Sequence, residues 1–169
     1  MDFIDTSKDE ILLRYIESVV EKSCQEEENI KNNLGNSAQR LIGLIAVILG
    51  FQLIKIDSIK LSNNFFESLF SLIALSFLFI SLLYSILSLF PYGKKYDGLP
   101  KDFTIFTSDK THNLTPLTAR KGMIKCYIDI IKNNSQINHY RGNLIYKSSA
   151  FGLLGSILTV FSFLFSKFL

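Results

Sequence analysis

The chain of 169 residues has few of the residues from which catalytic and metal sites are built. Its two cysteines lie in polar segments, which suits reduced thiols in a cytosol better than a disulfide scaffold. Its two histidines, His112 and His139, have no cysteine or carboxylate at metal-ligand spacing. No glycine-rich phosphate loop or nucleophile elbow occurs, and no arginine precedes a histidine by four to six residues, the spacing of one type of RNase. We therefore expect a protein that is not an enzyme and that holds no metal or cofactor.

Charge is also missing from three apolar stretches. The longest, residues 68–93, contains a 22-residue core that can cross a hydrocarbon layer of about 30 Å at about 1.5 Å per residue. Residues 148–166 form a second span of 19 uncharged residues. These blocks exclude a water-soluble enzyme, in which apolar and polar residues would alternate at short period. They predict an all-α integral membrane protein.

The remaining block, residues 41–54, is short for a span, because only 14 uncharged residues separate Arg40 from Lys55. That length also fits a helix that lies on the membrane. If both cations extend to the interface, a helix over about 38–58 can cross a slightly thinned bilayer. The positions of the basic residues favour this third span.

Lysine and arginine are unevenly distributed between the spans: five lie in residues 1–40, two in 55–67, ten in 91–147 and one after the last span. The positive-inside rule then places the N-terminus and residues 91–147 in the cytoplasm, with the short loop and the C-terminus outside. Three spans satisfy this arrangement and two do not. The predicted segments are an N-terminal amphipathic cytoplasmic helix (1–36), a transmembrane hairpin (37–92, with spans at about 38–58 and 68–90), a basic cytoplasmic segment (93–147) and a third transmembrane helix (148–169).

The two cytoplasmic segments have opposite net charge, about −4 for residues 1–40 and about +6 for residues 91–147, and are expected to pair. Ser7 and Glu10 have capping-box spacing, and Gly35 with Asn36 predicts the end of the first helix. The face that this helix is expected to turn to a partner consists of Leu12, Tyr15, Ile16, Val19 and Val20.

In the middle segment, residues 103–107 alternate like a short strand. Thr115 and Pro116 resemble an N-cap followed by a first-turn proline. No proline follows them. We therefore expect a long helix that begins there and continues directly into the last span.

Each span carries a stripe of small or weakly polar residues. The stripe of the last span is Ser148, Gly152, Gly155, Thr159, Ser162 and Ser166. The second span has Ser71, Ala74, Ser81, Ser85 and Ser88, and the first has Asn36, Gln39, Gly43, Ala46 and Gly50. Such stripes allow close packing of helices in lipid, or they line a water-filled path in a homo-oligomer. For a path, the last span is the first choice and the second span the next.

Basic and aromatic residues of the middle segment are candidates for an anion site. Cations that neutralise phosphates and phenols that stack on bases are the groups that bind a cyclic nucleotide or an oligonucleotide. Anionic lipid and the acidic N-terminal helix are the competing partners for the same charges. The candidate ligand residues are Arg120, Lys121, Lys125, Tyr127 and Arg141.

The order of these elements resembles a known group of proteins. The likeness is carried by residues 36–50 (NSAQRLIGLIAVILG) and 141–154 (RGNLIYKSSAFGLL) and by the architecture. The chain resembles the small transmembrane effectors of bacterial anti-phage defence: Pycsar transmembrane effectors, SLATT-type effectors of CBASS-like systems, the Hailong effector and CRISPR-accessory membrane proteins. A third span departs from the two-span SLATT pattern.

This resemblance implies a partner defence protein, either an enzyme that makes a nucleotide signal or a sensor of nucleic acid. It also implies disruption of the inner membrane when infection is sensed. The sequence thus predicts an oligomeric pore that a nucleotide or nucleic-acid signal gates. The alternative is a non-conducting anchor or scaffold whose cytoplasmic helices recruit a soluble partner.

Overall fold

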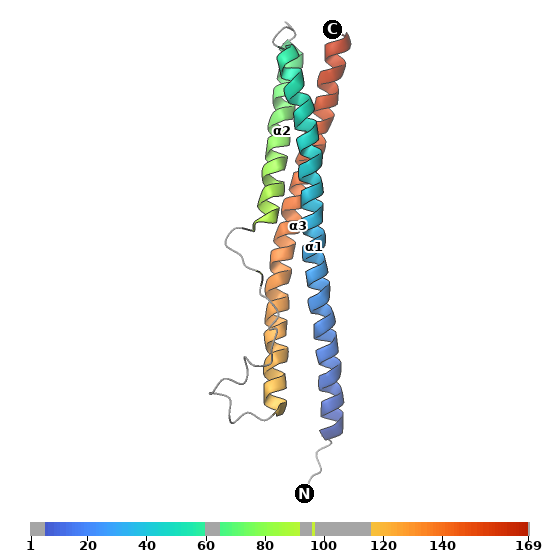
Figure 1. Ribbon diagram of the computed structural model, residues 1–169, viewed down its shortest axis with the longest axis vertical. Coiled ribbons are helices and arrows are strands. Elements are labelled where there is room, and N and C mark those ends of the chain that lie inside the picture. Colours follow the sequence, from blue (N-terminus) through green and yellow to red (C-terminus); the bar gives the residue numbers. More distant parts are fainter. Residues whose placement is uncertain (1–5, 60–64, 92–95, 97–115, 169) are drawn as a thin grey trace. The chain divides into compact units, whose positions relative to one another are not determined.

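The computed structural model describes residues 6–59, 65–91, 96 and 116–168 (Figure 1). Its elements are the helices α1 (Thr6–Ile59), α2 (Phe65–Leu89) and α3 (Pro116–Phe168), with no strand in these ranges. All three helices contain a stretch that is long and apolar enough to cross a membrane. The predicted all-helical class with three candidate spans is confirmed. The short strand expected at residues 103–107 lies outside the described residues.

The helix boundaries correct one prediction and confirm another. α1 continues through Gly35 and Asn36, so the helix end predicted there is wrong. Glycine inside a helix costs only about 1 kcal/mol, and a long helix can absorb that cost. A Cβ at Gly35 would lie 3.7 Å from Nη2 of Arg141, so the glycine lies beside a large side chain of α3. α3 begins at Pro116 and continues through the last span, as predicted.

The chain divides into two compact units, and α1 and α3 contribute to both. Unit 1 comprises Met1–Lys31 and Lys94–Asn138, and unit 2 comprises Asn32–Gly93 and His139–Leu169. All of α2 therefore belongs to unit 2.

In unit 2, α1 and α3 run parallel to each other and α2 runs antiparallel to both. Residue numbers rise together from the pair Ile45 and Gly152 to the pair Gln52 and Thr159. They change in opposite directions between α2 and α3, where Ser81 pairs with Ser148 and Ser71 pairs with Ser162. Helices that follow each other in the sequence are thus antiparallel, and the three form one bundle.

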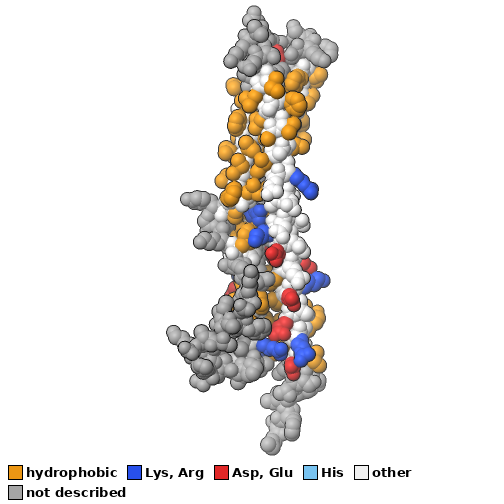
Figure 2. Space-filling view, viewed as in Figure 1, with side chains coloured by type: hydrophobic (Ala, Val, Ile, Leu, Met, Phe, Trp, Pro, Cys, Tyr) orange, Lys and Arg blue, Asp and Glu red, His pale blue; other side chains and the backbone are white. Residues whose placement is uncertain are grey.

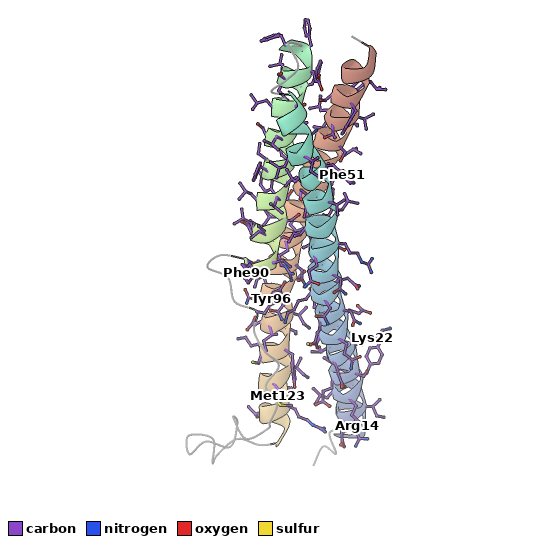
Figure 3. All side chains as sticks on the ribbon, turned by 45° about the horizontal axis from the view of Figure 1, so that its top comes forward. Arg14, Lys22, Phe51, Phe90, Tyr96 and Met123 are labelled. Atoms are coloured by element: carbon purple, nitrogen blue, oxygen red, sulfur yellow. The ribbon has the colours of Figure 1, made fainter. Side chains whose placement is uncertain are left out.

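The bundle of unit 2 is apolar on the outside as well as in its core. Ile45, Leu49 and Leu78 form a buried cluster, against which half-buried leucines and an isoleucine pack. Large exposed apolar side chains surround it, including Phe51 of α1 and Phe90 after α2 (Figure 3). In Figure 2, hydrophobic side chains cover the part of the view where α2 and the C-terminal half of α1 lie, whereas charged side chains gather along the N-terminal half of α1. An apolar exterior that encloses buried hydroxyls is typical of a membrane-embedded bundle.

In unit 1, α1 and α3 are also parallel, since Glu10 meets Arg120 and Glu27 meets Asn138. The buried apolar residues of this pair are Leu13, Val20, Cys24, Met123 and Ile137.

The face predicted for the N-terminal helix is only partly right. Val20 is buried and Ile16 half-buried, but Leu12, Tyr15 and Val19 are exposed. The apolar residues of this helix occur in adjacent pairs such as Leu12 and Leu13, so two neighbouring faces are apolar and periodicity cannot choose between them.

Candidate functional site

The small-residue stripes of α2 and α3 face each other inside unit 2. On α3, the side chains of Ser148, Thr159 and Ser162 and the positions of Gly152 and Gly155 are buried. Ser166 lies in α3, but its side chain is outside the described ones. The α2 residues Ser71, Ala74, Ser81, Ser85 and Ser88 are buried as well. Close helix packing within one protomer therefore covers both stripes that were considered for a pore lining.

Serine hydroxyls join α2 to α3 at one level of the bundle. Ser148 Oγ donates to the carbonyl of Ser81 at 2.8 Å, and Ser81 Oγ donates to the carbonyl of Ser148 at 2.6 Å. Ser85 Oγ lies 2.6 Å from Ser148 Oγ, and Ser88 Oγ donates to the Ser85 carbonyl at 2.7 Å. We call these four residues the serine cluster. Reciprocal bonds of this kind satisfy hydroxyls that lipid cannot satisfy.

Two glycines of α3 allow the helices to approach closely. A Cβ at Gly152 would lie 2.9 Å from Ser81 Oγ, and a Cβ at Gly155 would lie 2.8 Å from Cγ of Leu78 and 3.2 Å from the carbonyl oxygen of Ala74. Contacts this short require the neighbours to move. Both positions therefore require glycine for the packing observed.

A second polar group of unit 2 is centred on Gln52, which is fully buried. Its Nε2 donates to Thr159 Oγ1 at 2.7 Å, and Thr159 Oγ1 donates to the carbonyl of Gly155 at 2.8 Å. Ser71 and Ser162 share a hydroxyl hydrogen bond at 2.5 Å. We call Gln52, Thr159, Ser71 and Ser162 the Gln52 cluster. Gln52 was visible in the sequence as the one strongly polar side chain of the first apolar block, but its partner, 107 residues away, was not.

Arg141, one of the five candidate ligand residues, is buried in unit 2. Its Nε donates to the carbonyl of Ser88 at 2.7 Å, close to the C-terminal end of α2. The last carbonyls of a helix lack partners within the helix and carry partial negative charge, so a guanidinium stabilises that end. In this position, Arg141 acts as a cap for α2.

The other four candidate ligand residues belong to unit 1. Arg120 lies between two acidic residues of α1, with Nε 3.4 Å from Glu17 Oε1 and Nη1 3.9 Å from Glu10 Oε1. The expected pairing of acidic and basic segments is thus present at Arg120. Lys121 and Lys125 are exposed on α3, and Tyr127 is half-buried.

A further hydrogen-bond network in unit 1 was not predicted. Tyr96 Oη donates to Asn138 Oδ1 at 2.6 Å, and Asn138 Nδ2 donates to Glu27 Oε2 at 2.7 Å. Lys31 Nζ lies 4.7 Å from the centre of the Tyr96 ring. No motif marks these residues, because their contacts join three separate parts of the chain.

The thiol of Cys24 is also placed in unit 1. Burial raises the pKa of Cys24, and the negative charge of Glu21 one turn earlier raises it further. The other thiol, Cys126, is only partly buried.

The stripe of α1, in contrast to the other two, has no cover within unit 2. Asn36, Gln39, Gly43 and Ala46 are exposed and Gly50 is half-buried. A Cβ at Gly43 or Gly50 would meet nothing within 4 Å. We call these five residues the uncovered α1 face.

Comparison with known proteins gives no relative: no family model, curated protein or solved structure matches the chain. Among the described residues, no group of three His, Cys, Asp or Glu side chains could hold a metal ion. Any function must therefore be argued from the bundle and its charged helices.

Proposed function

We propose that the protein is a homo-oligomeric membrane effector of bacterial anti-phage defence, which permeabilises the inner membrane in response to a nucleotide or nucleic-acid signal. The observation that carries this proposal is the uncovered α1 face. Small residues in a span allow a second helix to approach closely, and exposed amides beside them can form hydrogen bonds across that contact. A second copy of the chain, presenting the same face, supplies both.

Disulfide cross-linking in isolated membranes tests this assembly. In a chain whose Cys24 and Cys126 are replaced by serine, Ala46→Cys should form covalent dimers on oxidation. Leu83→Cys is the matched control, because Leu83 is a lipid-facing residue of α2 with 59% exposure. We expect dimers about tenfold more abundant for Ala46→Cys than for Leu83→Cys. Equal cross-linking at both positions would remove the α1 face as the interface.

Permeabilisation is tested with purified protein in liposomes. Release of a trapped ion or dye, measured with and without cyclic nucleotides and short oligonucleotides, should occur with the wild type. Ala46→Leu should reduce it, because a larger side chain separates the α1 faces. If no condition produces release, the protein does not conduct, and the anchor or scaffold function takes its place.

Topology is a separate part of the proposal. In unit 2, Gly35 lies beside Arg141, and Arg141 binds Ser88, so one end of the bundle gathers the beginning of two spans and the end of the other. Together with the ten basic residues of 91–147, this arrangement supports a cytoplasmic location for that end. A reporter fused at Asp109 should be cytoplasmic and one fused after Leu169 periplasmic. A periplasmic signal at Asp109 would contradict the orientation.

The signal is proposed to bind at Lys121 and Lys125, which are exposed and adjacent to the ion-paired Arg120. An anion there would compete with the α1 carboxylates for Arg120. Binding of cyclic nucleotides and oligonucleotides to detergent-solubilised protein, without anionic lipid, should weaken about tenfold in Lys121→Gln/Lys125→Gln. Lys132→Gln, an equally exposed cation of α3, is the control. If the wild type binds none of these compounds, the nucleotide site is abandoned.

One observation favours the alternative function, a scaffold that recruits a soluble partner. Ile11, Leu12, Tyr15 and Val19 of α1 form an exposed apolar row in unit 1. If the protein is a scaffold, its production should arrest cell growth although the purified wild type releases no ions from liposomes. Leu12→Ser/Tyr15→Ser should then abolish the growth arrest, and this variant should release no ions either. Wild-type release that these changes leave intact would favour the pore.

A further inference from the structure

The interior of the unit 2 bundle contains two polar groups separated by an apolar layer. The serine cluster lies at the level of Ser148 on α3, and the Gln52 cluster lies at the level of Thr159 and Ser162. Eleven residues of helix separate Ser148 from Thr159, which corresponds to about 16 Å along the axis. Ile45 and Leu78, both fully buried, occupy the space between these levels, next to Gly152 and Gly155.

Gln52 carries an unsatisfied acceptor in this interior. Its Oε1 is buried and has no hydrogen-bond partner among the described residues. Turning the amide over does not help, because Thr159 can then serve the oxygen only by leaving the nitrogen without a partner. A buried acceptor without a donor costs about 1–3 kcal/mol, so the side chain requires a second partner, which the described residues do not supply.

The surrounding groups indicate what that partner is. The four side chains of the Gln52 cluster are neutral amide and hydroxyl groups, so a dehydrated ion would have no opposite charge beside it. A water molecule requires about two to four polar partners. Gln52 Oε1 is one of them, and the hydroxyls at the same level of the bundle are those of Thr159, which binds the Gln52 amide, and of Ser162, three residues further along α3. Hydroxyls and water both donate and accept, so they can also pass a proton along a chain of hydrogen bonds.

We propose that a water molecule donates to Gln52 Oε1, and that Ile45 and Leu78 form the barrier between this hydrated Gln52 cluster and the serine cluster. Narrow apolar constrictions exclude water and so block conduction. Displacing the two side chains would join both clusters into one file of hydrogen-bonding groups through a single protomer. The conduction part rests on the proposed membrane-permeabilising function and deepens it, because it places a route for water and protons inside each bundle.

The barrier is tested by proton leak in liposomes that contain a trapped pH indicator. Leu78→Ser, which makes the apolar layer polar, should raise the leak about tenfold. Leu83→Ser on the lipid-facing side of the same helix should leave it unchanged. Adding Gln52→Met to Leu78→Ser should lower the leak again, because the acceptor that holds water is lost. Ile45→Ser is the second barrier variant, in case Leu78→Ser does not fold. If the barrier variant that folds leaks protons no faster than Leu83→Ser, Ile45 and Leu78 do not form a barrier.

The water is tested independently of conduction. In lipid nanodiscs with ¹⁵N-labelled glutamine, the side-chain amide signal that disappears in Gln52→Met should receive magnetisation from water. The exposed Gln25 of unit 1 is the positive reference. Deuterium exchange of the Gln52 amide that is more than about a hundredfold slower than that of Gln25, without transfer from water, overturns the water site. Wild-type liposomes that release nothing, combined with water at Gln52, refute the proposed function but leave this site intact.

Discussion

Two stripes of small residues, one on α3 and one on α1, are alike in sequence and differ in structure. On α3, Gly152 and Gly155 lie so close to α2 that a single methyl group would collide with Ser81 or Leu78. On α1, Gly43 and Gly50 have open space beside them. The α3 stripe is therefore buried inside the bundle, whereas most of the α1 stripe is exposed on the outside of unit 2. A stripe of small residues thus shows that another helix can pack closely there, but only the surrounding structure shows which helix does so.

The largest difference is expected from bulky substitutions. Gly155→Leu places a side chain where Leu78 and the Ala74 carbonyl already lie, so the bundle must open. We expect a loss of about 1–3 kcal/mol in stability, measured as a lower midpoint of thermal unfolding in detergent. Gly50→Leu has open space beside it and gains helix propensity, so it should be at least as stable as the wild type. Phe161→Leu, on an exposed part of α3, should remain within about 0.5 kcal/mol of the wild type. Equal destabilisation by Gly155→Leu and Gly50→Leu would erase the distinction between the stripes.

Removal of a hydroxyl sharpens the comparison within α3. Ser148→Ala deletes the bonds that the Ser148 hydroxyl makes to the Ser81 carbonyl and to Ser85 Oγ, and it leaves the bond from Ser81 Oγ to the Ser148 carbonyl in place. The expected cost is about 1–2 kcal/mol in the same unfolding assay. Ser149→Ala is the control, because the Ser149 hydroxyl is exposed and bonds only to the Ile145 carbonyl of its own helix. Should both variants unfold alike, the serine cluster would contribute nothing particular.

Replacing a stripe glycine by alanine should give a smaller difference in stability between the two stripes. Gly43→Ala gains helix propensity at no steric cost, and we expect up to about 1 kcal/mol of added stability. Gly152→Ala gains the same propensity but brings its Cβ to 2.9 Å from Ser81 Oγ, so it should give no net gain. The measurement is the difference between the two unfolding midpoints. A higher midpoint for Gly152→Ala than for Gly43→Ala would contradict it.

The two thiols of unit 1 also differ in burial, and this difference should change their rates of alkylation. Cys24 is buried and its pKa is raised, so less of it is thiolate at neutral pH than of an ordinary thiol. Alkylation of Cys24 in the Cys126→Ser chain should therefore be slower than that of Cys126 in the Cys24→Ser chain. The rate for Cys24 should continue to increase as pH rises above the usual thiol range. Faster labelling of Cys24 at neutral pH would show that α1 and α3 separate readily in unit 1.

The parts of the fold that follow from local composition could be predicted. The apolar blocks located three spans, and Pro116 located the start of α3. The helix end predicted at Gly35 was wrong because a glycine alone does not end a helix. In the structure, Gly35 lies inside α1, beside the side chain of Arg141. The pairing between Arg120 and the α1 carboxylates followed from net charge alone, without its partners being identified.

The contents of the site depend on contacts between distant residues and could not be predicted. The stripes of α2 and α3 could be recognised in the sequence. Packing of the two stripes against each other, however, was only one of two interpretations, the other being a water-filled path. Gln52 meets Thr159, and Asn138 joins Glu27 to Tyr96, only because the helices pack in one particular register. Arg141 illustrates the limit: its charge suggested an anion site, and its neighbours make it a helix cap.

The order of the spans has a consequence for synthesis. The hydrogen-bond partners of the Ser81 and Ser85 hydroxyls and of the Ser88 carbonyl lie in α3. Arg141, which binds that carbonyl, is translated about fifty residues after Ser88. During that interval the hairpin of α1 and α2 must reside in the bilayer, or in the insertion machinery, with Gln52 and the α2 serines facing lipid or a chaperone instead of the last helix. A ribosome that stops before Arg141 therefore releases a chain whose α2 serines and Gln52 lack their partners in α3.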